Sequence, residues 1–305
     1  MQSCVFGPVP SRRLGRSLGV DLVPYKTCSF DCIYCQLGKT TQKTIERREW
    51  VPIDAVVEQL ETRLSSKPDY ITLSGSGEPT LHSRIGELIV RIKALTTTPI
   101  AVLTNGSLLW QKELRAQIMD ADLILPSLDA GDDEIFNAVN RPHAALKHDA
   151  IVQGLIDMRQ EFRGIYWLEI LLVEGVNSQP SALDSLAACV KHIKPDRVQL
   201  NTVVRPPADP DVTGLSQSKM AELALRFCPH AEVIADFSKA LDHPDMMAGL
   251  RDVLSLLERR PCSIEDVAYG LGMHRDEVIK YTNRLVSRGQ IQVKHTKDGT
   301  YYLIR

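Results

Sequence analysis

The chain has 305 residues, of which 24% are charged and 44% hydrophobic, and its formal net charge is −2. This length suffices for one large domain or two with a full hydrophobic core, and the nearly balanced charge excludes a polyelectrolyte. No stretch approaches the roughly 18 consecutive apolar residues of a transmembrane helix, and the N-terminus lacks the basic start and apolar run of a signal peptide. We therefore expect a cytoplasmic protein without membrane association, in a compartment where thiols stay reduced.

The first segment, residues 1–16, is rich in Gly, Pro and Arg, and its prolines disfavour a helix. We expect it to lie across one end of the domain. Its arginines, Arg12, Arg13 and Arg16, are either solvated surface charges or contacts for an anionic substrate. Residues 17–23 read S-L-G-V-D-L-V, which predicts a first strand.

A cluster of three cysteines follows this strand, in the pattern C-x3-C-x2-C formed by Cys28, Cys32 and Cys35. Three thiols this close cannot all pair with one another, so the pattern favours a metal or an iron–sulfur centre over a disulfide. A four-iron cluster on three cysteines would leave its fourth iron open to a ligand that is not protein. The alternatives are a zinc knuckle without its fourth ligand and cysteines buried as small hydrophobes. No histidine lies before His82 to complete a zinc site, which favours the iron–sulfur interpretation.

The remaining cysteines do not form a second cluster. They are spread along the chain as Cys4, Cys189, Cys228 and Cys262, and Cys189 lies in an apolar stretch typical of a helix face. We therefore expect a single iron–sulfur centre.

From residue 17 to about 240, short apolar segments alternate with amphipathic ones. The apolar segments are rich in Ile, Val and Leu and are too short for helices, so they predict strands at residues 70–73, 100–104, 123–127, 165–173 and 197–201. Helical periodicity lies between them, for example at residues 54–64 and 85–95. With the first strand this makes six strand–helix units, which predict an α/β fold with a parallel sheet that right-handed crossovers close, at least partly, into a barrel. Residues 231–237 would add a further strand.

Polar residues follow the ends of successive predicted strands, where barrels of this kind place their chemistry. In chain order they are Gly75, Ser76, Gly77 and Glu78 after the second strand, Asn105 after the third, Ser127 and Asp129 after the fourth, Glu169 on the fifth and Asn201 at the end of the sixth. The glycines let the backbone approach a ligand closely, and Glu78 offers a carboxylate.

Each of these residues alone also has a structural interpretation. Asn105 and Asn201 could close turns, Glu78 could lie in a solvated turn, and Asp129 could cap a helix that begins near Asp132. Their ordered recurrence at strand ends favours a common site.

The pattern changes in the last sixty residues, where we expect helices at residues 246–258, 264–269 and 274–287 and two short strands joined by a turn at Asp298 and Gly299. Ser263 is an N-cap candidate with Asp266 at the capping-box position. This order predicts a winged helix-turn-helix. From residue 246 onward the net charge is +3, against −5 for the rest, so the unit could bind nucleic acid, although winged helices also bind peptides and proteins. Its basic residues on or near the third helix and the wing are Arg275, Lys280, Arg284, Arg288, Lys294 and Lys297.

The cysteine motif after a first strand resembles that of the radical S-adenosylmethionine (SAM) superfamily, and S-G-S-G-E-P-T resembles its glycine–glycine–glutamate motif, with Ser76 interrupting the glycine pair. The resemblance implies a partial (βα)6 radical-SAM barrel and a [4Fe–4S] cluster on Cys28, Cys32 and Cys35, whose open iron chelates SAM. It also implies an electron donor of flavodoxin or ferredoxin type. The implied SAM-binding residues are Tyr34, Gly75, Ser76, Gly77, Glu78, Asn105, Ser127, Asp129 and Asn201, with Glu78 on the amino group and Ser127 or Asp129 on the ribose hydroxyls or the methionine carboxylate.

Within this superfamily the chain looks most like the wyosine-synthase-like group, over about residues 5–240, through V-P-S-R-R-L-G-R-S-L-G-V-D-L, T-N-G and N-R-P-H. Archaeal wyosine synthases carry a second cluster on further N-terminal cysteines. Only Cys4 precedes Cys28 here, so that cluster is not expected, and the winged helix points to a different substrate.

We therefore expect an enzyme that cleaves SAM reductively and uses a 5′-deoxyadenosyl radical to abstract hydrogen from a substrate that the sequence does not identify, with RNA and peptide as the candidates. Residues 1–244 would form the barrel and residues 245–305 the winged helix, which would recruit a partner and take no part in radical generation. The alternative is a regulator in which an iron–sulfur barrel senses SAM or redox state and the winged helix binds DNA. Formation of 5′-deoxyadenosine separates the two.

Overall fold

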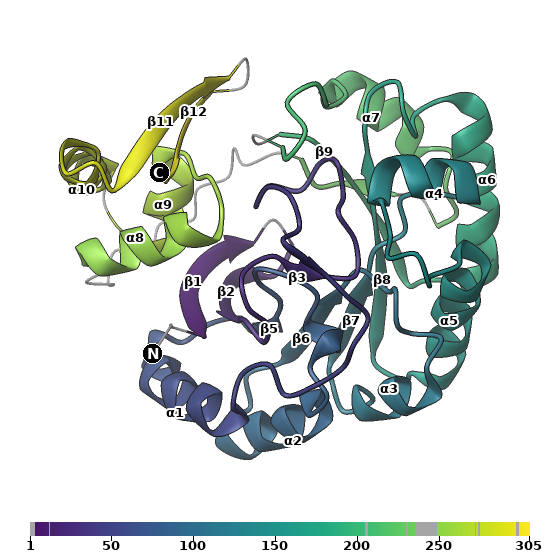
Figure 1. The fold of residues 1–305 in the computed structure, drawn as a ribbon, viewed down its shortest axis with the longest axis horizontal. Helices are drawn as coiled ribbons and strands as arrows, with labels where there is room; N and C mark the ends of the chain where they lie inside the picture. The colour runs from purple at the N-terminus through teal and green to yellow at the C-terminus, as the bar shows by residue number, and fades with distance from the viewer. Residues whose placement is uncertain are drawn as a thin grey trace.

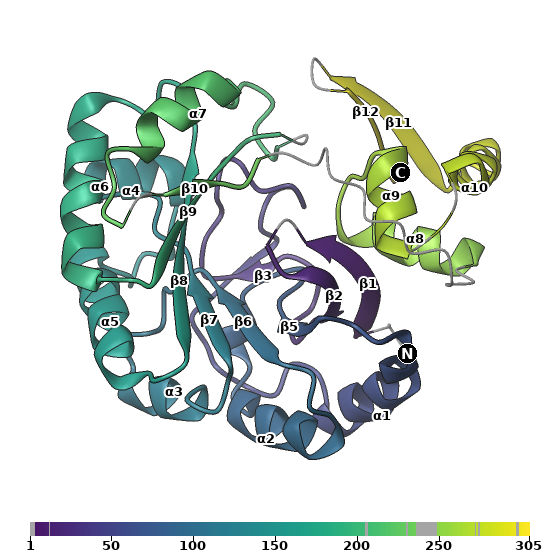
Figure 2. The same ribbon diagram turned by 180° about the vertical axis from the view of Figure 1, so that it is seen from behind.

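The core of the protein is an eight-stranded sheet with the strand order β1-β2-β5-β6-β7-β8-β9-β10 (Figures 1 and 2). The computed structural model describes residues 4–11, 13–204, 207–229, 231–235, 249–271, 273, 275–296 and 299–305. All neighbouring strands of this sheet are parallel except β1 and β2. The strands are β1 (Val5–Ser11), β2 (Gly15–Val20), β5 (Tyr70–Leu73), β6 (Ile100–Thr104), β7 (Leu123–Pro126), β8 (Ile165–Leu172), β9 (Arg197–Thr202) and β10 (Glu232–Val233). The predicted α/β fold with a mostly parallel sheet is confirmed.

The strands are buried because helices cover the outer face of the curved sheet (Figures 1 and 2). The helices that follow the strands are α1 (Ile53–Arg63), α2 (Ile85–Leu95), α3 (Lys112–Gln117), α4 (Asp133–Asn140), α5 (His148–Glu161), α6 (Pro180–Ile193) and α7 (Gln217–Ala224), with short 3-10 turns at η1 (Leu64–Ser66) and η2 (Pro79–Leu81). On α2, the buried residues Ile85, Leu88, Ile89 and Ile92 form one stripe at helical spacing. Burial of each such side chain stabilises the fold by about 1.5–3 kcal/mol. No helix among these has the length and apolar character needed to cross a lipid bilayer, within the described part of the chain.

The first segment contains a strand that the sequence pattern does not predict, at residues 5–11. β1 pairs antiparallel with β2, from Val5 opposite Val20 to Ser11 opposite Gly15, with a bulge in between. Prolines obscured this strand in the sequence, because they cannot donate to a ladder and are tolerated only where the strand lies at a sheet edge. Of its arginines, Arg12 lies outside the described residues.

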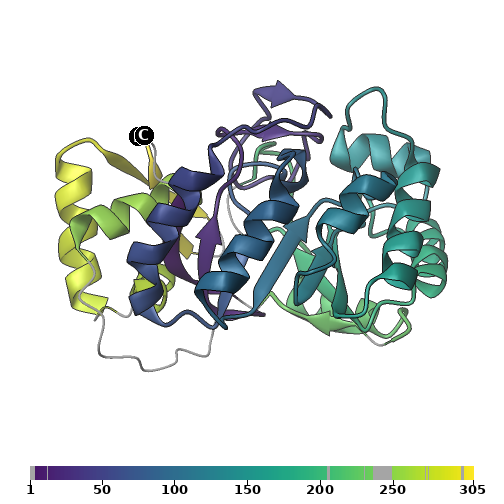
Figure 3. The same cartoon turned by 90° about the horizontal axis from the view of Figure 1, so that it is seen from below.

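The last part of the chain forms a compact unit next to β1 and α1 (Figures 2 and 3). It comprises α8 (Leu250–Arg259), α9 (Ile264–Leu271), α10 (Arg275–Ser287) and the antiparallel hairpin of β11 (Ile291–Thr296) and β12 (Gly299–Ile304). We call these residues, 249–305, the C-terminal unit. Its three helices and hairpin occur in the predicted order. The predicted capping box is present, because the Asp266 amide donates to Ser263 Oγ (3.0 Å) and the Ser263 amide donates to Asp266 Oδ2 (3.0 Å).

Some predicted features fall on positions outside the described residues. These are the start of the first C-terminal helix at residues 246–248, residues 236–237 of the predicted last strand, His274, Lys297 and Asp298. The described part of that last strand is β10, which is shorter than predicted.

The hydrophobic core of the C-terminal unit extends into β1. Val253, Leu256 and Leu257 of α8 are buried in one cluster with Phe6 and Val9 of β1. A glycine makes this packing fit, because a Cβ at Gly19 on β2 would lie 2.2 Å from the Phe6 ring. The edge strand of the sheet is therefore covered on its outer side by α8 and α9.

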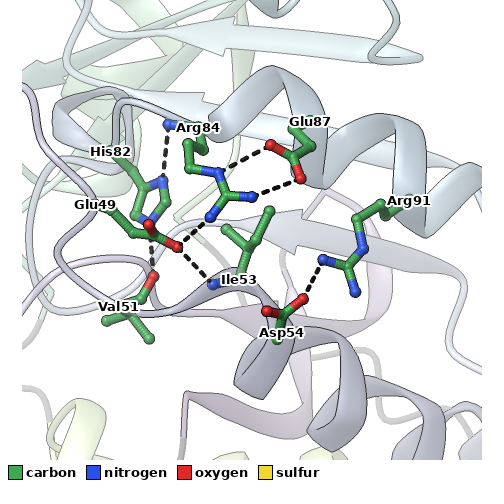
Figure 4. A network of polar contacts seen from close by, with 8 residues as sticks. All are labelled: Glu49, Val51, Ile53, Asp54, His82, Arg84, Glu87 and Arg91. Carbon is green, nitrogen blue, oxygen red and sulfur yellow. Dashed lines mark hydrogen bonds and ion pairs between the residues drawn. The ribbon is translucent and has the colours of Figure 1, made fainter.

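A polar network joins the segment before α1 to the start of α2 (Figure 4). The guanidinium of Arg84 donates to Glu87 through Nε (2.9 Å) and Nη2 (2.7 Å) and to Glu49 through Nη1 (2.8 Å). His82 is buried in this network: Nδ1 accepts from the Arg84 amide (3.2 Å), and Nε2 lies 2.8 Å from the Val51 carbonyl oxygen. These two contacts fit one neutral tautomer, in which Nε2 carries the proton. Burial is the main cause that lowers the pKa of His82 below its usual value.

Replacing His82 by Gln should reduce the loss of stability on acidification. The unfolded chain takes up the His82 proton near pH 6.5 while the folded chain resists it, so the free energy of unfolding falls as the pH drops below that value. Urea unfolding of both proteins between pH 7.5 and 5.5 measures this contribution as the difference between their pH slopes. Equal slopes would show that His82 does not couple folding to pH.

Candidate active site

The cysteine loop follows β2 and folds over the carboxyl ends of the strands. A short parallel pair, β3 (Thr27–Cys28) and β4 (Gln42–Lys43), closes the loop at its base. Its middle is held by the end of α4, because the amides of Asp31 and Ile33 donate to the carbonyls of Asn140 and Val139 (3.0 Å each). The loop is therefore fixed both at its base and in its middle.

Each cysteine sulfur has its own polar neighbour. Asn105 Nδ2 lies 3.5 Å from Cys28 Sγ, Asn140 Nδ2 lies 3.5 Å from Cys32 Sγ, and Lys26 Nζ lies 3.0 Å from Cys35 Sγ. Burial raises the pKa of Cys28 to about 12 and raises that of Cys32 well above its usual value, so without a cation these thiols stay protonated. Iron would hold them as thiolates, which the three donors would stabilise.

The arrangement fits a cluster better than a single ion. No group of three or more His, Cys, Asp or Glu side chains in the described ranges is placed to hold a metal ion. Cysteines that share a multi-iron cluster bind different irons, so their sulfurs lie farther apart than the ligands of one zinc ion. His82 cannot complete a zinc site, because its two ring nitrogens face Val51 and Arg84.

A cavity of about 300 Å³ lies beside Cys28 and Cys32 at the mouth of the barrel. Seven of the nine predicted SAM-binding residues line it: Tyr34, Gly75, Gly77, Glu78, Asn105, Ser127 and Asp129. The other two lie close by, since Ser76 is buried behind the glycine motif and Asn201 lines an adjoining cavity. The structure thus brings residues from the cysteine loop and three strand ends to one cavity.

Glu78 is buried, so the solvated-turn interpretation is wrong. Its Oε1 accepts from the Thr80 amide (3.0 Å), Thr80 Oγ1 (2.6 Å) and Thr104 Oγ1 (2.6 Å), and its Oε2 accepts from the Asn105 amide (2.7 Å). Burial raises the pKa of Glu78, and these hydrogen bonds oppose the shift. The carboxylate is held rigidly and faces the cavity, which suits it to a cationic group such as an ammonium.

Asp129 is also buried and does not cap the following helix. It accepts from the Leu171 amide (2.9 Å), from Asn140 Nδ2 (2.8 Å) and from the Tyr34 hydroxyl. Asp132 caps α4 in its place, through a bond from the Ile135 amide (2.9 Å). Burial raises the pKa of Asp129 to about 6. Asp129 thus anchors the aromatic residue of the cysteine motif, which the sequence could not reveal.

The two asparagines have mixed roles. Asn105 Oδ1 closes a turn by accepting from the Ser107 amide (3.0 Å), as the structural interpretation held, while its Nδ2 donates to Ser29 Oγ (2.8 Å) and faces Cys28. Asn201 donates to Glu169 Oε1 (2.9 Å), and Glu169 also pairs with Arg13 (2.8 Å). Arg13 is therefore not a solvated surface charge.

The glycine motif lies directly against the cysteine loop. The Lys26 amide donates to the Ser76 carbonyl (2.9 Å), and the Glu78 amide donates to the Thr27 carbonyl (3.1 Å). Between them Gly77 touches Thr27 so closely that an added Cβ would lie 1.8 Å from the Thr27 oxygen. The residue at this position must therefore be glycine if the two segments are to stay in register.

A second cavity of about 390 Å³ adjoins the first and shares five lining residues with it: Tyr34, Ser74, Gly75, Leu103 and Glu169. Cys35 and Asn201 also line it. Its opposite wall includes Phe6 and Val9 of β1 and three residues of or next to α8, namely Leu256, Arg259 and Arg260. The sequence pattern limits the predicted site to the barrel and does not predict that residues of α8 line this second cavity.

Sequence reasoning also overlooked Lys26, Asp21 and Asn140. Asp21 directly follows β2, so the rule that found the other strand-end residues could have found it. Lys26 lies two residues before Cys28, where a cation near three thiolates is a reasonable expectation. Asn140 lies in the N-R-P-H motif, but no local signal indicates that its side chain faces a cysteine.

Comparison with known proteins gives matches along most of the chain. The family model of the Radical SAM superfamily matches residues 22–184. The chain is 33% identical over 304 residues to a UPF0026 protein of Helicobacter pylori, which covers 98% of this chain and 96% of that protein. It is 36% identical over 293 residues to a protein of Brachyspira hyodysenteriae named GTPase Obg, where the match covers 94% of this chain but only 43% of that protein's length.

Among solved structures, a radical SAM methyltransferase from Sphaerobacter thermophilus superimposes with a TM-score of 0.56. The superposition covers 75% of this chain and 68% of that chain, at 16% sequence identity. This likeness concerns the fold alone and agrees with a partial barrel.

Replacing Gly77 by Ala should disrupt the junction of the two segments, because the added methyl would overlap the Thr27 oxygen. We expect the free energy of unfolding to fall by about 1–3 kcal/mol, the usual cost of overpacking, and iron uptake on anaerobic reconstitution to fall with it. Gly249→Ala is the control, because the nearest atom to a Cβ there is 3.8 Å away. Normal iron uptake by Gly77→Ala would contradict a tight junction.

Proposed function

This chain belongs to the radical SAM superfamily and to the UPF0026 proteins, and from that membership and the geometry of its site we propose that it cleaves SAM reductively to start a radical reaction on a substrate. It is a radical SAM enzyme, and its cofactors are a [4Fe–4S] cluster and SAM. Held by Cys28, Cys32 and Cys35, a reduced cluster would supply one electron to the sulfonium of SAM, which would release methionine and a 5′-deoxyadenosyl radical that abstracts hydrogen from the substrate.

The observation that carries the proposal is the meeting of Cys28, Cys32 and a buried carboxylate at one cavity, with Cys35 lining the cavity that adjoins it. Cys28, Cys32 and Cys35 would hold the cluster, with Asn105, Asn140 and Lys26 as the polar neighbours of their sulfurs. Half-buried thiols that each face a separate donor suit thiolate ligands.

Glu78 would bind the amino group of SAM. Its Oε2 accepts one hydrogen bond, from the Asn105 amide (2.7 Å), which leaves this oxygen able to accept another from an ammonium group. Asp129, Ser127, Tyr34 and Asn105 would contact the ribose or the methionine carboxylate, while Gly75 and Gly77 would let the backbone approach the ligand. Ser76 is buried behind the motif and would support its backbone. Asn201 lines the adjoining cavity and would face the substrate.

Within the superfamily we place the chain nearest the wyosine-synthase-like group, on the motifs given above, with a single cluster. We also propose a division into a barrel, residues 1–244, and a winged helix-turn-helix, residues 245–305, that recruits an RNA or peptide substrate. Exposed basic residues on or next to α10 and on β11, Arg284, Arg288 and Lys294, support a role in recruitment. A flavodoxin- or ferredoxin-type protein would deliver the electron.

Anaerobic reconstitution of the full chain should yield about four irons and four sulfides, as one [4Fe–4S] cluster requires. Cys28→Ala, Cys32→Ala and Cys35→Ala should each lose most of this iron, because each removes one ligand. Cys189→Ala, on the outer helix α6, is the matched control and should keep it. Zinc in place of iron, or about eight irons per chain, would contradict a single cluster.

Glu78→Gln and Asp129→Asn should weaken SAM binding while the iron content stays unchanged. Loss of one charge-assisted hydrogen bond costs about 1.5–3 kcal/mol, or roughly 10- to 150-fold in the dissociation constant. Glu87→Gln on α2 removes a surface carboxylate outside the cavity and is the control. The assignment fails if both site variants bind SAM as the wild type does.

The same preparations separate an enzyme from a sensor. The reduced wild type should release 5′-deoxyadenosine from SAM, and chromatography of the quenched mixture measures it. A reconstituted, reduced protein that binds SAM without forming 5′-deoxyadenosine would overturn the enzymatic proposal.

A further inference from the structure

We propose that Arg259 of the C-terminal unit is a positioning residue for the glycine motif that binds SAM, so that the SAM site is complete only when α8 is docked on the barrel. The inference rests on the proposed function of the motif at residues 74–78. It departs from our sequence-based expectation that the C-terminal unit takes no part in radical generation.

Arg259 reaches from the end of α8 into the barrel mouth. Its Nη1 forms an ion pair with Asp21 Oδ2 and lies 3.0 Å from Ser76 Oγ. The two charged side chains are 10% and 5% exposed, so the pair is almost completely removed from water. These contacts connect residues that are 238 and 183 positions apart in the chain.

Asp21 transmits this contact to the glycine motif. Ser76 Oγ donates to Asp21 Oδ2 (2.5 Å), and the Asp21 carboxylate lies so close to Gly75 that a Cβ there would be 2.5 Å from Asp21 Cγ. Gly75 also has a φ of +143°, a backbone conformation open to few residues other than glycine. The backbone of the motif is therefore pressed against a carboxylate whose counter-charge comes from α8.

The next residues of the motif extend into the site. The Ser76 carbonyl accepts from the Lys26 amide (2.9 Å) of the cysteine loop, and Gly77 and Glu78 line the cavity beside Cys28. Displacement of Ser76 therefore moves Glu78 relative to the cysteines. Without Arg259, Asp21 would be a buried carboxylate with no cation beside it, which is unfavourable enough to make the carboxylate take up a proton or the loop rearrange. Burial already raises the pKa of Asp21, and Arg259 is the largest opposing influence.

A second ion pair across the same interface offers a comparison. Arg63 of α1 pairs with Asp252 of α8 (3.3 Å), but these side chains are 36% and 32% exposed and neither lines the first cavity. If the C-terminal unit only needs to be attached, loss of either pair should have similar consequences. If Arg259 positions the motif, only the loss of the Arg259 pair should weaken SAM binding.

The test uses the full-length, reconstituted chain and measures the dissociation constant of SAM together with the change that SAM causes in the EPR spectrum of the reduced cluster. Arg259→Met should weaken SAM binding at least tenfold and reduce the spectral change, with iron content unchanged. Arg259→Lys keeps the charge beside Asp21 and should restore part of the affinity. Arg63→Met should stay within about twofold of the wild type.

A milder variant keeps the test valid if Arg259→Met does not fold. Ser76→Ala leaves the ion pair intact and removes only its link to the motif, so it should also weaken SAM binding. Wild-type affinity in both Arg259→Met and Ser76→Ala would overturn the inference. An equal loss in Arg63→Met and Arg259→Met would also overturn it, because docking alone would then explain the effect.

The same measurements separate this inference from the proposed function. If SAM does not bind the wild type, or Glu78→Gln and Asp129→Asn leave binding unchanged, the assignment of the site is wrong and the inference falls with it. If those two variants lose SAM while Arg259→Met and Ser76→Ala do not, only the role of Arg259 is wrong.

Discussion

The site depends on one close contact, the backbone junction between the cysteine loop and the glycine motif. Two hydrogen bonds, from Lys26 to Ser76 and from Glu78 to Thr27, join the segments, and Gly77 leaves no room for a side chain between them. This junction sets the position of Glu78 relative to Cys28. The glycine motif is fixed by β5, and the cysteine loop is fixed by β2 and α4. The groups that would bind the two cofactors are therefore held rigidly by the barrel.

Three buried carboxylates surround this junction, and each is stabilised differently. Glu78 and Asp129 are held by neutral donors from the backbone and from hydroxyl and amide side chains, whereas Asp21 has a guanidinium beside it. A carboxylate that is held by neutral donors keeps its negative charge, which can attract a ligand. A carboxylate that is paired with an arginine has its charge balanced by the guanidinium. On this ground Asp21 belongs to the protein scaffold, and Glu78 and Asp129 are the carboxylates that we propose for the ligand.

Much of this arrangement was predictable from local patterns. β5, β6 and α2 span the predicted residues because short Ile- and Val-rich runs and a 3.6-residue stripe are unambiguous over those lengths. Strand-end residues could be found because parallel strands place their carboxyl ends together. Local patterns failed where the structure depends on distant contacts: the prolines of β1 concealed an edge strand, and nothing near Arg259 indicates that it meets Asp21.

The shared core of β1 and the C-terminal unit has a consequence for biosynthesis. Phe6 and Val9 leave the ribosome long before Val253, Leu256 and Leu257, which cover them. The outer face of the first strand therefore stays uncovered while nearly all of the barrel is being translated. The nascent chain must therefore keep this apolar sheet edge from contacting other nascent chains until α8 has been translated.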